Sequence, residues 1–289
     1  MASRAVAEST ETGCRSSIVN DEIFAFCGSP GSLLIVTDLE TIERVAGWLR
    51  ESSYTVVLTG AGISTESGIP DFRGPQGVWT KNPGAERAAT IQNFMANRDS
   101  RVRSWQNRIS NNTWADAQPN AGHIALATLE RKGKLDTLVT QNIDSLHLKA
   151  GSSQSRIIEI HGTVRDFVCM GCGERGPIER VLDRVRAGEE DPPCRTCGGI
   201  LKSATISFGQ NLVPEDLERA ERAASECECF LAVGTSLTVY PVALLPEMAL
   251  RNGARLVILN AQDTPYDQIA HEVISEQIGD VLPRIVDAV

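Results

Sequence analysis

The sequence lacks several features that mark other classes of protein. Its 289 residues include no run of about eighteen apolar side chains, so no membrane-spanning helix is expected. It has no basic excess either, because 28 Lys and Arg face 37 Asp and Glu, and the net charge is −9. This balance argues against direct partners among nucleic acids or anionic membranes. The first residues lack the basic and apolar regions of a secretory signal, so we expect a cytoplasmic protein.

The composition is that of an ordinary globular protein. Hydrophobic residues make up 42% and charged residues 22%. The length suits one large domain, alone or with a smaller one. An acidic surface would suit basic, lysine-rich protein partners. In the cytoplasm the eight cysteines should stay reduced, which favours metal binding or buried thiols over disulfides.

Strand-like and helix-like segments alternate along most of the chain. The expected strands are 55–59, 135–140, 156–160, 204–208, 229–233 and 255–259, and the expected helices are 38–50, 120–131, 214–225, 241–251 and 278–289. Such alternation predicts an α/β fold, a Rossmann-like doubly wound parallel sheet with helices on both faces.

Composition changes along the chain suggest four parts. We predict an N-terminal extension (1–37), expected to be flexible and to hold the unremarkable thiols Cys14 and Cys27; a Rossmann-like domain (38–77, 119–164 and 204–289); a helical insert or lid (78–118); and a small zinc-ribbon-like domain (165–203). The aromatic side chains of the insert, such as Trp105, are expected to pack inside a small helical module.

A glycine turn directly follows the first predicted strand. Thr55–Thr59 leads into Gly60-Ala61-Gly62, the pattern that opens a dinucleotide-binding unit. Thr65 stands where a third glycine is usual, so an ordinary strand-to-helix turn remains an alternative. The tail Gly68–Arg73, with its proline, carboxylate, aromatic ring and guanidinium, favours a phosphate site over that alternative.

Two Cys-x-x-Cys pairs predict a metal site. Cys169 and Cys172 are separated from Cys194 and Cys197 by twenty-one residues, and glycine follows each pair. Four thiolates make a closed tetrahedral zinc site without an open position for water, so the zinc should be structural. Scattered structural or redox cysteines are the alternative. One or both of Cys227 and Cys229, beside or within a predicted strand, are expected to be buried apolar residues.

Polar residues stand at the ends of later predicted strands. Gln141, Asn142 and Asp144 follow one strand, and His161 follows another. Parallel sheets bind ligands at these carboxyl ends, and imidazole can act as a general base near neutral pH. Polar caps and a satisfied core histidine are the alternatives. The other histidines, His123, His147 and His271, are expected to be structural.

These motifs together resemble the sirtuins, NAD-dependent protein-lysine deacylases. The matching stretches, in order, are Thr59–Arg73, Thr140–His147, His161-Gly162, the two cysteine pairs, and Gly234-Thr235-Ser236 with Asn260. The resemblance covers roughly residues 38–289. It implies NAD and structural zinc as cofactors and acyl-lysine proteins as substrates; it leaves the oligomeric state open.

The resemblance also implies a reaction and its residues. In this family the acyl oxygen attacks the nicotinamide ribose, nicotinamide leaves, and a ribose hydroxyl is then deprotonated. His161 is the implied general base, and Asn142 the second catalytic residue. The implied cofactor contacts are Gly60, Ala61, Gly62, Ile69, Asp71, Phe72, Arg73, Gln141, Asn142, Asp144, Gly234, Thr235, Ser236, Asn260 and Val281.

The substrate segment departs from the family pattern. The family commonly has Phe-Gly-Glu-x-Leu-Pro, whereas this chain has Phe208, Gly209 and then Gln210, with one residue inserted before Pro214. Phe208 and Gly209 are implied to bind substrate by strand addition. Sirtuins that remove succinyl or malonyl groups carry a Tyr and an Arg spaced three apart soon after the Asp-Phe-Arg motif. No such pair is visible at 77–81, which favours acetyl or longer neutral acyl groups.

Two other functions remain open from the sequence. The same pocket would serve protein ADP-ribosyl transfer with a different nucleophile, or NAD hydrolysis or sensing without a protein substrate. The complete set of His161, Asn142 and the Phe208-Gly209 segment favours deacylation, most of all deacetylation.

Overall fold

The structure is a computed structural model of the chain. It describes the strands 15–19 and 22–26, and residues 37–289 apart from 73, 75–76, 83, 85–88 and 111–115. Two units are distinguished, residues 1–36 and 37–289. In the first, β1 (Arg15–Val19) pairs with β2 (Glu22–Phe26) in antiparallel register. Cys14 and Cys27 lie outside the described residues, and the flexibility of this extension stays a prediction.

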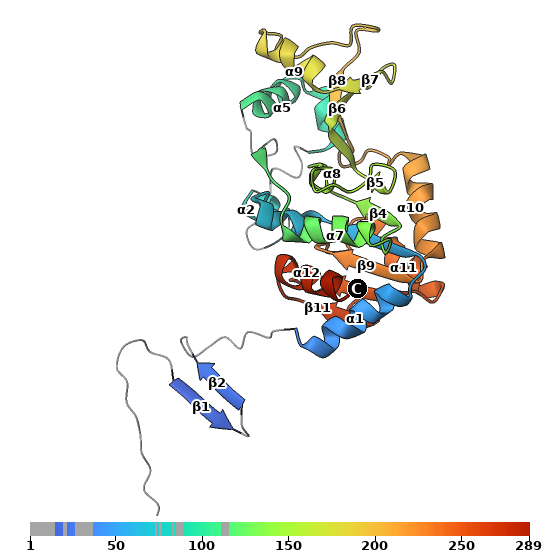
Figure 1. Cartoon of the computed structure of the whole chain (residues 1–289). Coiled ribbons are helices and arrows are strands. Elements are labelled where there is room, and N and C mark those ends of the chain that lie inside the picture. Colours follow the sequence, from blue (N-terminus) through green and yellow to red (C-terminus); the bar gives the residue numbers. More distant parts are fainter. Residues whose placement is uncertain are drawn as a thin grey trace, which may run out of the picture. The chain divides into compact units, whose positions relative to one another are not determined.

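A six-stranded parallel sheet forms the centre of the second unit (Figure 1). Its strands are β3 (Thr55–Thr59), β4 (Thr137–Thr140), β5 (Ile157–Glu159), β9 (Cys229–Val233), β10 (Arg255–Leu259) and β11 (Glu272–Ile274). The order is β11-β10-β9-β3-β4-β5, with every neighbouring pair parallel. The predicted α/β class is confirmed; the edge strand β11 was not predicted. The chain winds outward in both directions from β3 and β9, so a ligand-binding crevice is expected where these two strands meet.

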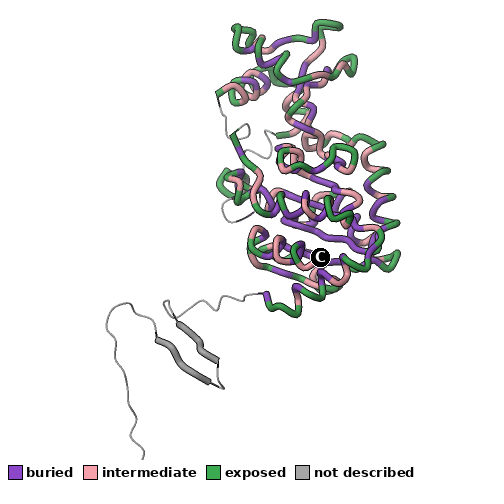
Figure 2. Tube along the Cα trace, viewed as in Figure 1, coloured by how far each residue is buried: buried purple, intermediate pink, exposed green. Residues whose placement is uncertain are grey.

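Successive apolar side chains of the strands point to opposite faces of this sheet, and helices cover both faces. Val57, Leu231 and Val257 pack on one side under the helices α1 (Leu39–Glu51), α7 (Ala121–Arg131) and α12 (Ile278–Ala288). Leu58 and Phe230 pack on the other side under α10 (Pro214–Glu226) and α11 (Leu245–Arg251), which follows the short 3₁₀ helix η2 (Val242–Leu244). Figure 2 shows the resulting buried layer running through the strands. Strand side chains alternate between faces, so a continuously apolar strand is typical of this arrangement.

Two helix starts match the residues that precede them. The Asp38 side chain accepts a hydrogen bond from the Thr41 N–H at the start of α1. Asn120 accepts from the N–H groups of Gly122 and His123 at the start of α7. Both are N-caps of the kind that Asp and Asn favour.

Cys227 and Cys229 are buried, with 3% and 1% of their surface exposed. They belong to the cores on opposite faces of the sheet. The prediction that they serve as small apolar core residues is confirmed.

A second, antiparallel sheet forms a small lobe. It contains β6 (Gly162–Cys169), β7 (Arg175–Pro177) and β8 (Leu201–Thr205) in the order β7-β6-β8, with α9 (Glu179–Arg186) packed beside it. The strand predicted at 204–208 was therefore wrong in its bounds and in its sheet. The observed strand, β8, begins three residues earlier, ends at Thr205 and pairs with β6 instead of joining the parallel sheet.

The predicted helical insert includes α2 (Val78–Lys81), α4 (Ile91–Ala96) and α5 (Arg98–Ser110). Trp105 on α5 is 1% exposed and packs with Phe167 and Val181 of the small lobe. A packing role for Trp105 was expected, but inside a separate helical module. The structure instead places Trp105 in the core of the small lobe, because α5 packs there. The four domain boundaries themselves stay predictions. No helix in the described part of the chain is long and apolar enough to cross a membrane.

Candidate active site

The turn after β3 contacts the end of β9 directly. After Gly60 the chain forms a 3₁₀ helix, η1 (Ala61–Ser67). The Gly60 N–H donates to the Val233 carbonyl (3.1 Å), and the Gly62 N–H donates to the Gly234 carbonyl (2.8 Å). These two N–H groups are therefore engaged by the neighbouring loop. The glycines serve first to bring two strand ends together, a reason that sequence reasoning did not give.

Gly234 shows why this contact excludes larger residues. Its φ angle is +62°, and a Cβ added there would lie 2.3 Å from the Ile63 backbone nitrogen. Only glycine combines a positive φ with such a close approach. The contact between Gly62 and Gly234 thus closes the base of the crevice between β3 and β9. The next residues, Thr235 and Ser236, line its wall.

The end of β4 supplies two amides that tie three strands together. Gln141 Nε2 donates to Thr235 Oγ1 (2.8 Å). Asn142 Nδ2 donates to the Gly60 carbonyl (2.9 Å) and to Ser64 Oγ (3.1 Å). These bonds hold both amides, and both residues line the same cavity.

Asp144 is a buried carboxyl with defined partners. Ser64 Oγ donates to its Oδ2 (2.8 Å), and the Leu146 N–H donates to its Oδ1 (2.9 Å). Burial raises the pKa of Asp144, against the effect of these hydrogen bonds. Ser64 was not singled out from the sequence. Its position four residues after Gly60 was the available signal, since a polar residue in the first turn after a glycine-rich strand end faces the site.

Two neutral histidines lie beneath these residues. His123 Nδ1 lies 3.0 Å from Asn120 Oδ1, and His147 Nε2 lies 2.9 Å from Thr59 Oγ1. Their rings are 4.9 Å apart. Burial lowers the pKa of His123 to about 4 and that of His147 well below its ordinary value. These contacts support the structural roles predicted for both residues.

His161 differs from these histidines because it lies on the cavity wall. Its Nδ1 is 3.1 Å from the Gln141 carbonyl oxygen. A carbonyl only accepts, so Nδ1 carries the proton and Nε2 of the neutral ring keeps its lone pair. Burial lowers the pKa of His161. The ring is therefore neutral near pH 7 and able to accept a proton at Nε2.

One cavity of about 1360 Å³ gathers nearly all the predicted site residues. It exceeds the roughly 300–1000 Å³ typical of a pocket for one small ligand. The predicted residues on its wall are Gly60, Ala61, Gly62, Ile69, Asp71, Phe72, Gln141, Asn142, Asp144, His161, Phe208, Gly209, Gly234, Thr235, Ser236 and Asn260. The volume leaves room for two substrates side by side.

Two predicted cofactor contacts are not placed there. Arg73 lies outside the described residues. The Val281 side chain is fully buried in the core under α12 and does not line the cavity. Ile278, one turn earlier on α12, lines the cavity instead.

The predicted substrate segment is already paired on one edge. The Phe208 N–H donates to the Ala89 carbonyl (3.2 Å), and the Ile91 N–H donates to the Phe208 carbonyl (2.9 Å). Both backbone groups of Phe208 are therefore used within the chain. A peptide adding a strand would pair with other backbone groups of this segment.

The departure at Gln210 has a local explanation. Gln210 Oε1 accepts a hydrogen bond from the Ser207 N–H (3.2 Å), and the Gln210 N–H donates to the Ser207 carbonyl (3.0 Å). The amide side chain thus closes the turn that carries Phe208 and Gly209. A carboxylate would accept the same bond.

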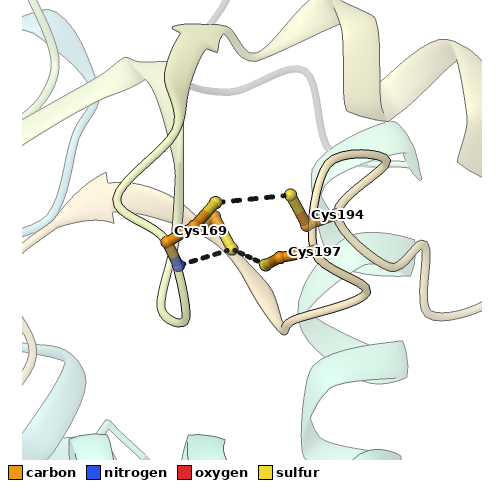
Figure 3. A group of neighbouring side chains, drawn as sticks. Cys169, Cys194 and Cys197 are labelled. Atoms are coloured by element: carbon orange, nitrogen blue, oxygen red, sulfur yellow. Dashed lines mark hydrogen bonds between the residues drawn. The ribbon is translucent and has the colours of Figure 1, made fainter.

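The four cysteines of the predicted zinc-ribbon-like domain meet at one point of the small lobe (Figure 3). The sulfur atoms of Cys169 and Cys197 are 3.5 Å apart, and those of Cys172 and Cys194 are 3.8 Å apart. Four ligands at the usual Zn–S distance of about 2.3 Å in a tetrahedron would lie about 3.8 Å from one another. The Gly171 N–H donates to Cys169 Sγ (3.4 Å), a contact that would stabilise a thiolate ligand. The donor set fits a zinc ion, and none of the four cysteines lines the cavity.

Comparison with known proteins supports the same assignment. The model of the Sir2 family matches residues 60–241. NAD-dependent protein deacetylase 2 of Streptomyces coelicolor is 50% identical over 230 residues, which cover 80% of this chain and 95% of that protein. NAD-dependent protein deacetylase 1 of Bradyrhizobium diazoefficiens is 43% identical, with 88% and 98% covered.

Solved structures agree with the relatives. A Sir2 protein bound to deacetylated p53 peptide and 3′-O-acetyl ADP-ribose has a TM-score of 0.77 and 35% identity, with 85% of this chain and 97% of that chain covered. A Sir2 protein bound to a propionylated peptide has a TM-score of 0.74 and 34% identity, with the same coverage. With the glycine turn, the strand-end amides, His161 and the tetracysteine cluster in place, this chain belongs to the Sir2 family.

Proposed function

We propose that the chain is an NAD-dependent protein-lysine deacylase, and first of all a deacetylase. It transfers the acyl group from lysine to ADP-ribose and releases nicotinamide. The observation that carries this proposal is His161, a neutral imidazole with an unprotonated Nε2, on the wall of a cavity large enough for two substrates. The relatives named as deacetylases, and the structure that holds 3′-O-acetyl ADP-ribose with a deacetylated peptide, support the reaction.

Different residues on the sheet side of the cavity would bind different parts of NAD. NAD would lie across the β3–β9 crevice, with its phosphates and distal ribose near Gly234, Thr235, Ser236 and Asn260. Asn142 and Gln141 would orient the nicotinamide ribose, since both amides are fixed by neighbouring strands. Asp144 would meet the nicotinamide amide, and Ile69, Asp71 and Phe72 would complete that pocket.

His161 would act after nicotinamide has left. Its Nε2 accepts the proton of a ribose hydroxyl, and the resulting oxygen attacks the acyl carbon. The Gln141 carbonyl fixes the tautomer and stabilises the imidazolium that forms. Phe72 lies 40% exposed at the cavity, where its ring would shield the reactive carbon from water.

The zinc ion has a separate role. Bound by Cys169, Cys172, Cys194 and Cys197, it would hold the small lobe together and supply no chemistry to the cavity. Protein substrates are expected to place the acyl-lysine side chain in the cavity beside Phe208 and Gly209. A cytoplasmic location and the absence of nucleic-acid and membrane partners stay predictions.

One assay separates this proposal from its alternatives. Purified protein, an acetyl-lysine peptide and NAD are incubated and analysed by mass spectrometry. Deacylation yields O-acetyl-ADP-ribose and free lysine in equal amounts. ADP-ribosylated protein without deacetylated peptide would instead indicate a transferase, and free ADP-ribose formed without peptide would indicate NAD hydrolysis.

A further inference from the structure

Two cationic side chains line the small-lobe wall of the cavity. Lys202 lies on β8 and is 3% exposed, and Arg108 lies near the end of α5. Sequence analysis singled out neither residue. Their positions matter because the sheet-side wall carries the carboxyl groups Asp71 and Asp144, so the two walls differ in charge.

The hydrogen-bond partners of both cations are uncharged. Lys202 Nζ donates to the carbonyl of Thr205 and to that of Ser203 (3.3 Å), and lies 6.0 Å from the centre of the Phe94 ring. Arg108 Nη2 donates to the Val164 carbonyl (2.6 Å). Within the described part of the chain, no carboxylate forms an ion pair with either side chain.

Neither charge is well compensated by the protein. Burial lowers the pKa of Lys202 to about 8. Burial also lowers the pKa of Arg108, although Glu179 acts against this at longer range. Glu179 itself pairs with Arg186 (2.9 Å). Two desolvated cations facing one cavity favour an anionic ligand, because a buried charge is costly until it is paired.

Each of the other arginines of α5 has an acidic or polar partner. Arg98 pairs with Glu190, and Arg101 pairs with Asp191, each at 2.9 Å. Arg103 donates to Ser100 Oγ (3.2 Å). None of the three lines the cavity, which makes Arg103 a matched control for Arg108 on the same helix.

Both cations are anchored beside the proposed base. Thr205, which accepts from Lys202, is the partner of Gly162 in the small sheet. Val164, which accepts from Arg108, lies two residues beyond Gly162. The Ile206 N–H donates to the His161 carbonyl (2.8 Å). The positive wall therefore adjoins the place where the acyl group would be transferred.

We infer that Arg108 and Lys202 form a subsite for the terminal carboxylate of a dicarboxylic acyl group on the substrate lysine, of malonyl or succinyl size. This inference rests on the proposed function and names its substrate class. Arg108 has spare N–H donors for a two-pronged contact, while Lys202 adds charge. It departs from the neutral-acyl preference expected from residues 77–81, because the cations come from α5 and β8.

The test compares acyl groups on one peptide. Equilibrium binding of the acetyl-lysine and succinyl-lysine peptides is measured first, because binding can be read even if nothing is turned over. Values of kcat/KM with NAD follow. We expect the succinyl peptide to bind at least as tightly as the acetyl peptide, with a succinyl-to-acetyl ratio of kcat/KM above one tenth. Weaker succinyl binding, or a lower ratio, would overturn the inference.

Three variants assign the effect to residues. Arg108→Met and Lys202→Met should each lower the succinyl-to-acetyl binding ratio at least tenfold, whereas Arg103→Met should leave it unchanged. Arg108→Lys should restore part of the ratio, and the melting temperature of each variant shows whether it has folded. Unchanged ratios in folded Arg108 and Lys202 variants would exclude the subsite.

A further arm distinguishes the source of the carboxylate. Acetyl-lysine peptides with and without a glutamate beside the lysine are compared in wild type and in Arg108→Met. If the glutamate raises affinity only when Arg108 is present, the subsite binds substrate side chains and the acyl assignment is wrong. If neither acyl peptide is turned over although succinyl binding depends on Arg108, the deacylase proposal fails and the subsite stands.

Discussion

Strand β6 connects two regions that are built in different ways. Its first residue, Gly162, follows His161 at the cavity, and its last, Cys169, belongs to the tetracysteine cluster. The cluster takes two ligands from the end of β6 and the turn after it, and two from a second loop. The cavity instead takes its residues from strand ends spread between Gly60 and Asn260.

The difference lies in what holds each region in place. At the cluster, metal coordination would hold the two loops together, so binding and local folding are coupled. At the cavity, backbone and amide contacts between parallel strands position the groups before any ligand arrives. Loss of a ligand residue should therefore damage structure in the first region and chemistry in the second.

The largest expected effect is on the cluster. Cys169→Ser should remove about one equivalent of zinc and lower the stability by at least about 3 kcal/mol, or roughly 6–12 °C in melting temperature. Metal analysis and thermal unfolding measure both. Cys227→Ala is the matched control, because this buried thiol lies in the sheet core and its loss should leave the zinc content intact. A zinc-free variant as stable as wild type would show that the two regions do not differ in this way.

The next effect is on chemistry. His161→Ala should lower deacylation about a hundredfold or more, since a general base is lost, while NAD binding and zinc content stay close to wild type. Steady-state kinetics and NAD titration test this. His271→Asn serves as control: His271 lies outside the cavity, and its Nδ1 accepts the Leu256 N–H, a bond the amide oxygen can replace. Near-normal turnover in His161→Ala would refute the assignment of the base.

A smaller effect concerns stability in acid. Burial holds the pKa of His123 at about 4 against 6.5 when exposed, so between these values only the unfolded state takes up the proton. Stability should therefore fall as pH drops below 6.5, by about 2 kcal/mol at pH 5 from this group alone. His123→Gln should remove that part of the pH dependence in urea unfolding at pH 7 and pH 5. Equal slopes in both proteins would mean that His123 titrates normally when folded.

The smallest expected effect is a shift in the acid limb of the rate profile. His161 must be neutral to accept a proton, and burial lowers its pKa. The acid half-point of kcat/KM, which reports the free enzyme, should thus lie below 6.5, the ordinary value for histidine. A pH series with one acetyl peptide measures it. A half-point above 6.5 would indicate that a nearby negative charge outweighs burial.

The two regions also differed in how far the sequence revealed them. The zinc site could be predicted because ligand spacing is local: Cys169 and Cys172 come from one turn, and Cys194 and Cys197 from another. The cavity residues could be predicted one motif at a time, since each follows a strand. The contacts that join these motifs could not be predicted. The Gln141–Thr235 and Gly62–Gly234 hydrogen bonds depend on the order of strands in the sheet.

Other misses have the same physical cause. Ser64, Arg108 and Lys202 carry no motif, and their place on the cavity wall follows from how η1, α5 and β8 pack. The strand predicted at 204–208 was assigned to the wrong sheet because an apolar run does not show its pairing partner. Val281 repeats the apolar spacing of α12, which buried it in the core.

The turn closed by Gln210 has a consequence for how the enzyme would respond to its surroundings. The Gln210 amide oxygen accepts the Ser207 N–H without carrying a charge, so this hydrogen bond does not depend on proton concentration. A glutamate there would form a stronger, charge-assisted bond, which protonation of the carboxylate would weaken. The hydrogen bond that closes this loop should therefore persist at low pH. Any acid sensitivity of the reaction would then come from titratable groups in the cavity, such as His161.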